Sequence, residues 1–179
     1  MSDTLITIIA IFLFAVLMFI FPLMSVSERN DDIAQTVVQT ATSEFVKKVS
    51  TYGSIKPNDY SAYVHELHAT GNTYEIEIEV QHLDENPGKK QATTSSDLIG
   101  ENVYYSTYTT EILDTMFPTS GDEENYVLKK GDNIIVTVKN TNKTIAQLLR
   151  TFFYRVTGQG TYQVAASASS MIVNDGQVR

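Results

Sequence analysis

The chain has 179 residues, a formal net charge of −8 and no cysteine. The acidic balance argues against nucleic acid and anionic lipid as the main partners. The absence of cysteine excludes both a disulfide framework and a thiolate metal site.

The stretch Leu5–Met24 contains no charged residue, and Thr7 is its one polar side chain. A helix of this length spans the roughly 30 Å hydrocarbon core of a bilayer. A helix buried in a soluble protein would need a polar face, which this stretch lacks. We therefore expect residues 1–24 to form a membrane-inserted helix.

A secretory signal peptide is the competing interpretation of this stretch. It would need a basic region before the apolar run and a small-residue cleavage site after it. Residues 1–4 contain no Lys or Arg, and Ser25-Val26-Ser27 matches such a site poorly. An uncleaved anchor is therefore the favoured interpretation.

The orientation of the anchor is read from charge and composition. Arg29 is the one cation close to the span and weakly favours a cytoplasmic C-terminal domain. The remainder is rich in Thr, Tyr, Asn and Ser and poor in Arg, as surface-exposed bacterial adhesive and filament proteins often are. We expect a single-pass protein of the cell membrane, with an extracytoplasmic domain that could also lie in a surface filament.

Residues 25–52 are predicted to form an amphipathic helix. Pro22 should kink or break the preceding helix, and Ser25-Val26-Ser27-Glu28 fits a capping box that would restart it. The apolar stripe recurs every three or four residues; it consists of Ile33, Val37, Ala41, Phe45, Val49 and Tyr52. Gly53 and Pro57 should end the helix.

The remainder, residues 53–179, is predicted to be an α+β head. Helices are expected at 58–70, capped by Asn58 or Asp59, and at about 106–117 and 143–156. Strands are expected at 73–83, 126–129, 133–139 and 161–174, with a polar loop at 84–100. The fold class is thus a long hydrophobic and amphipathic N-terminal helix leading into a small antiparallel sheet with packed helices.

Candidate metal and catalytic patterns are weak. His65 and His68 stand three residues apart, whereas the zincin motif needs a spacing of four. Glu75, Glu77 and Glu79 alternate along a strand and are better explained as a wet sheet face than as a cation site. Residues 122–124 lack the ligand spacing of an EF-hand. We expect no metal, no cofactor and no enzymatic activity.

The layout resembles that of type IV pilin-like proteins. An uncharged N-terminal helix with Pro22 leads into an amphipathic helix and a small α+β head. Residues 131–139 and the terminal strand from Tyr162 to Val173 are similar to TadE-like minor pseudopilins of tight-adherence pilus systems. Pilins carry a Glu in the apolar span and a Gly before it, and this chain has neither. It is expected to be an unprocessed relative, or to be numbered from an unusual start.

The resemblance implies a non-enzymatic pseudopilin-like subunit of a pilus or secretion apparatus, whose partners are the membrane and other pilin-like subunits or itself. Apolar helices would then associate by packing. The residues assigned to this role are Ile8, Phe12, Ala15, Phe19, Pro22, Ile33, Val37 and Phe45. The alternative is a single-pass protein with an extracytoplasmic ligand-binding or sensor domain, which would bind through loop 84–100 or the acidic strand face.

Overall fold

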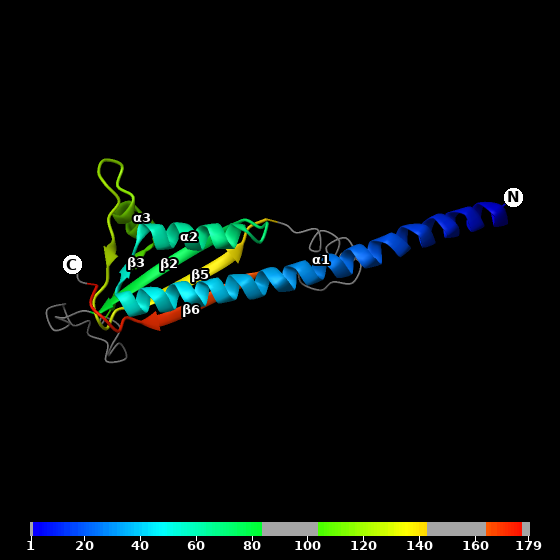
Figure 1. Cartoon of the computed structure of the whole chain (residues 1–179). Helices are drawn as coiled ribbons and strands as arrows, with labels where there is room; N and C mark the ends of the chain where they lie inside the picture. The colour runs from blue at the N-terminus through cyan, green and yellow to red at the C-terminus, as the bar shows by residue number, and fades with distance from the viewer. Residues whose placement is uncertain (1, 84–103, 143–163, 177–179) are drawn as a thin grey trace, which may run out of the picture.

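The computed structural model describes residues 2–83, 104–142 and 164–176, and it has the α+β layout expected from the sequence. A single long helix, α1 (Ser2–Tyr52), projects far beyond a small head made of a sheet and shorter helices (Figure 1). The C-terminal half of α1 lies against the head, and its N-terminal half extends away from it.

Helix α1 is continuous across its 51 residues, so the expected break at Pro22 and the restart at the capping box are wrong. At 1.5 Å per residue the helix is about 75 Å long. Pro22 lacks the N–H that would bond to the carbonyl four residues earlier, and the helix continues through the bonds of the neighbouring residues. The helix ends as predicted, because Gly53 adopts a φ of 67°. A Cβ at Gly53 would also collide with the carbonyl of Asn174.

The main sheet has four antiparallel strands in the order β3-β2-β5-β6. Their bounds are β2 Tyr74–Leu83, β3 Tyr104–Tyr108, β5 Asn133–Asn140 and β6 Ala165–Met171. Two short strands, β1 (Ser54–Ile55) and β4 (Tyr126–Val127), pair separately. The predicted strands at 126–129 and 161–174 are therefore present, but β4 ends at Val127 and β6 ends at Met171, while residues 161–163 lie outside the described residues.

The sheet buries one face and leaves the other exposed, as the alternation in β2 predicts. Ile78 and Val80 of β2 are buried, while Glu75 and Glu77 on the opposite face are exposed. In β5, Ile134, Val136 and Val138 are fully buried on the same inner face.

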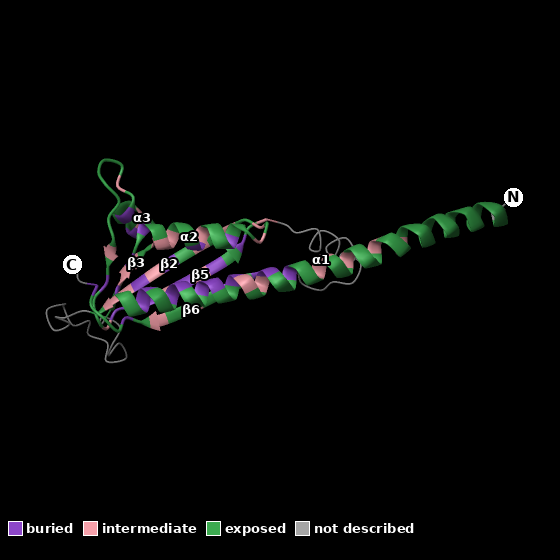
Figure 2. Ribbon diagram, in the orientation of Figure 1, coloured by how far each residue is buried: buried purple, intermediate pink, exposed green. Residues whose placement is uncertain are grey.

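Helix α1 covers that inner face, where it contacts β5, β6 and helix α2 (Pro57–His68). Its buried positions begin at Asp31 and Ala34 and continue through Val38, Ala41, Thr42, Phe45, Val46, Val49 and Ser50. Figure 2 shows this change from an exposed to a partly buried helix along α1. The head's hydrophobic core is formed between this stripe, the sheet and α2.

The predicted stripe is therefore only partly the buried one. Ile33 is 56% exposed, Tyr52 is also exposed, and Val37 is half-buried. Four residues turn an α-helix by about 40° more than one full turn. Over the four such steps from Ile33 to Val49 the stripe therefore drifts by about 160° around α1. The head covers the side that carries Ala34 and Val38 instead.

The two short helices also differ from their predicted bounds. Helix α2 begins after Lys56 with Pro57 in its first turn, so neither Asn58 nor Asp59 caps it. Helix α3 (Thr109–Met116) is preceded by β3, so residues 106–108 are a strand and not a helix. The predicted loop 84–100 and helix 143–156 lie outside the described residues.

Candidate functional site

Most side chains in the N-terminal part of α1 are apolar and exposed, while Leu17, Ile20 and Met24 are half-buried. We call residues Leu5–Val26 the apolar shaft. Within the described chain, α1 is the one helix long and apolar enough to cross a membrane, and its most apolar 18-residue window has a mean hydropathy of 3.0 with none of it buried. Such a surface is stable only when lipid or other apolar helices cover it.

Most residues assigned to helix packing lie on exposed parts of α1. Within the shaft the exposed ones are Ile8, Phe12, Ala15, Phe19 and Pro22. Beyond the shaft Ile33 is exposed and Val37 is half-buried. Phe45 differs, since it is only 4% exposed and packs inside its own head.

Phe45 belongs to an aromatic group between α1 and α2. Its ring stacks on Tyr63 at a centroid distance of 4.5 Å and meets Tyr60 edge-on at 6.4 Å. The hydroxyl groups of Tyr63 and Thr42 share a hydrogen bond of 2.9 Å. Burial raises the pKa of Tyr63 to about 12, against a smaller lowering by Thr42. This phenol is therefore neutral across the physiological range and acts in packing.

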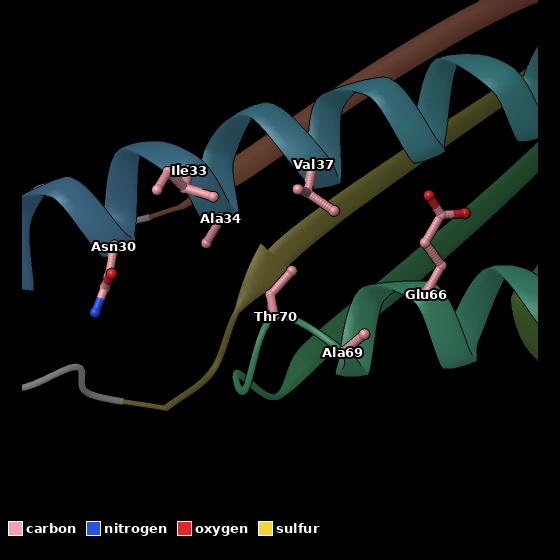
Figure 3. Close-up of a pocket in the computed structure, with 7 residues that line it drawn as sticks. All are labelled: Asn30, Ile33, Ala34, Val37, Glu66, Ala69 and Thr70. Atoms are coloured by element: carbon pink, nitrogen blue, oxygen red, sulfur yellow. The ribbon is translucent and has the colours of Figure 1, made fainter.

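A groove opens between α1 and the C-terminal end of α2, close to where α1 leaves the head (Figure 3). Its volume is about 480 Å³. From α1 it is lined by Asn30, Ile33, Ala34 and Val37. From the end of α2 and the residues that follow it, it is lined by Glu66, Ala69 and Thr70. The exposed Ile33 therefore adjoins a hollow that a further apolar side chain could fill.

A partly buried polar network joins β2, β4 and the start of β5. His82 Nδ1 lies 2.9 Å from Asp132 Oδ2, and His82 Nε2 lies 3.1 Å from the Tyr126 hydroxyl. Asp132 also accepts backbone N–H groups from Lys129 (2.9 Å) and Leu83 (3.3 Å). Burial raises the pKa of Tyr126.

Sequence reasoning missed this network because its members are 44 and 50 residues apart. Two features of the sequence could have indicated it. His82 falls on the inner face of an alternating strand, and Asp132 directly follows Gly131. The φ of Gly131 is 97°, which fits the third position of a type II turn. Both ring nitrogens of His82 already have partners. The Asp132 carboxylate accepts hydrogen bonds from two backbone N–H groups and also contacts His82. The network therefore links β2, β4 and the start of β5 and braces this end of the sheet.

The other candidate patterns lie on the surface. His65 and His68 are both exposed on α2, and the described residues contain no group of three or more His, Cys, Asp or Glu side chains placed to hold a metal. On the acidic strand face, Glu77 pairs with Lys139 at 3.3 Å, and Glu79 accepts a hydrogen bond of 2.7 Å from Ser106. Two of the carboxylates on the face proposed for ligand binding thus already have partners within the head.

Comparison with known proteins gives no relative: no family model, curated protein or solved structure matches the chain. The features that bear on function are therefore the apolar shaft, the groove and the continuous helix that joins the shaft to the head.

Proposed function

We propose that the protein is a non-enzymatic, single-pass membrane subunit that assembles through α1, in the manner of a pseudopilin within a pilus or secretion apparatus. The observation that carries this proposal is the apolar shaft, which extends from the head with most of its apolar side chains exposed and none of them buried. The head would lie outside the cytoplasm. Its partners would be the membrane and other pilin-like subunits, or further copies of itself.

The junction between shaft and head supports this role. Because α1 is one uninterrupted helix, the same element that enters the membrane also forms a layer of the head's core. The head therefore has a fixed orientation relative to the shaft, and neighbouring shafts would set the positions of neighbouring heads. Association of such helices in lipid depends on close packing and not on chemistry at a site.

Ile33 provides the test of assembly. Replacing Ile33 with Asp should leave the free energy of unfolding of the head within about 0.5 kcal/mol of wild type, because this side chain is largely exposed. It should nevertheless reduce intersubunit cross-linking in membranes, since a charge would be buried between subunits. The measurements are thermal unfolding in detergent and chemical cross-linking of membranes.

The matched control is Gln39→Asp, which introduces the same charge at an exposed position of α1 away from Ile33. This variant should cross-link as wild type does. If Ile33→Asp instead unfolds the head, Ile33 belongs to the monomer's core, and a monomeric anchored domain becomes the better explanation.

A further inference from the structure

We propose that two copies of this chain pair in parallel along a seven-residue repeat on α1, which we call the heptad seam. Its first set of positions, equivalent to a in a coiled coil, consists of Ile9, Val16, Leu23, Asn30 and Val37. Its second set, equivalent to d, consists of Leu5, Phe12, Phe19, Val26 and Ile33. The spacing alternates strictly between four and three residues, the pattern that two supercoiled helices require.

The residues beyond the apolar span distinguish this seam from neighbouring helix faces. Inside the span nearly every residue is apolar, so many faces would serve. Between Met24 and Val37, the exposed large hydrophobic side chains are Val26 and Ile33, which are seven residues apart. The alternative face through Ile8, Ala15 and Pro22 would continue through Arg29 and Thr36, whereas the seam continues through Asn30 and Val37.

The structure leaves this seam available to a partner. Its d positions are exposed from Leu5 to Ile33, and Asn30 is exposed among them. Asn30, Ile33 and Val37 line the groove beside α2, so a helix lying on the seam would also contact Ala69 and Thr70 (Figure 3). The seam ends after Val37, where the next two positions are Thr40 and Glu44.

A second copy is the partner that this surface fits. The pairing rests on the proposed membrane anchoring, because two copies inserted in one orientation are parallel and present the same residues at the same depth. Asn30 would then meet Asn30 of the other copy, and a single Asn at an a position fixes register and oligomeric state. The flanking e and g positions, Ser27, Arg29, Ala34 and Thr36, carry no acidic group. The e and g positions of two paired α1 helices therefore bring no carboxylates together across the seam.

The test uses single-cysteine variants of the full chain in membranes, since the chain itself has no cysteine. Val26→Cys and Ile33→Cys should each form disulfide-linked dimers on oxidation with copper phenanthroline. Asp32→Cys and Gln39→Cys are the controls, because both positions are exposed on another side of α1. We expect dimer yields at least about fivefold higher at the seam positions; equal yields at seam and control positions would overturn the proposal.

Two further variants separate the seam from other modes of assembly. Adding Asn30→Asp to Ile33→Cys should lower the dimer yield about fivefold by placing like charges together, and adding Gln39→Asp should not. Ile33→Cys mixed with Phe19→Cys tests a stagger of about 21 Å between helices. If cross-links formed only between Ile33→Cys and Phe19→Cys, the heptad seam would be overturned and the proposed assembly would stand. An absence of all cross-links would contradict both.

Discussion

Replacing Phe45 with Ala should lower the free energy of unfolding of the head by about 3–5 kcal/mol. The Phe45 ring is almost fully buried, stacks on Tyr63 and contacts Tyr60, so its removal leaves a cavity where α1 meets α2. The Tyr60 and Tyr63 rings pack against it from α2, and all three belong to or pack against the hydrophobic core of the head. The ring therefore contributes contacts that alanine cannot replace.

Thermal or denaturant unfolding of the full chain in detergent measures this loss. Tyr52→Ala is the matched control, because it removes an aromatic ring from the same helix at a position that is 56% exposed. Its effect should stay within about 0.5 kcal/mol. A loss below about 1 kcal/mol for Phe45→Ala would mean that α1 does not pack on α2 as described.

Replacing Asp132 with Ala should destabilise the head by about 3 kcal/mol. The Asp132 side chain is only 3% exposed, and its carboxylate accepts from two backbone N–H groups and contacts His82. Alanine would leave these partly buried donors without their acceptor, which costs more than the hydrogen bonds themselves contribute. The effect should appear first as fraying of the ends of β2 and β5.

Hydrogen exchange at the backbone amides of Leu83 and Lys129 would locate the damage from Asp132→Ala. Asp122→Ala serves as the control, because it removes an exposed carboxylate from a loop. Asp132→Asn should fall between the two, since it keeps one acceptor oxygen. If Asp132→Ala were as stable as Asp122→Ala, the network would not brace the sheet.

Local periodicity was sufficient to predict the sheet's main strands. The alternation in β2 and β5 reports directly which side chains face the core, and the structure confirms both strands and their faces. The end of α1 was equally predictable, because Gly53 must adopt a positive φ there. Each of these features depends on residues close together in the chain.

Features that depend on distant partners could not be predicted. The head, and not α1 itself, determines that Ala34 and Val38 are buried and that Ile33 is exposed. Similarly, β3 forms because Tyr105 and Thr107 pair with His82 and Val80, although the following residues favour a helix. Pro22 misled the prediction in the other direction, since one lost hydrogen bond did not interrupt a long helix. The groove and the His82 network arise only when separate elements pack together.

Deleting residues 1–24 tests most directly whether this protein is a folded head held by an apolar membrane helix. The full chain should sediment with membranes and require detergent for extraction. The truncated chain should be soluble and unfold cooperatively, because the buried stripe of α1 begins at Asp31 and Ala34 and is left intact. A full chain found in the soluble fraction, or a truncated chain that aggregates or unfolds without cooperativity, would contradict this division between anchor and head.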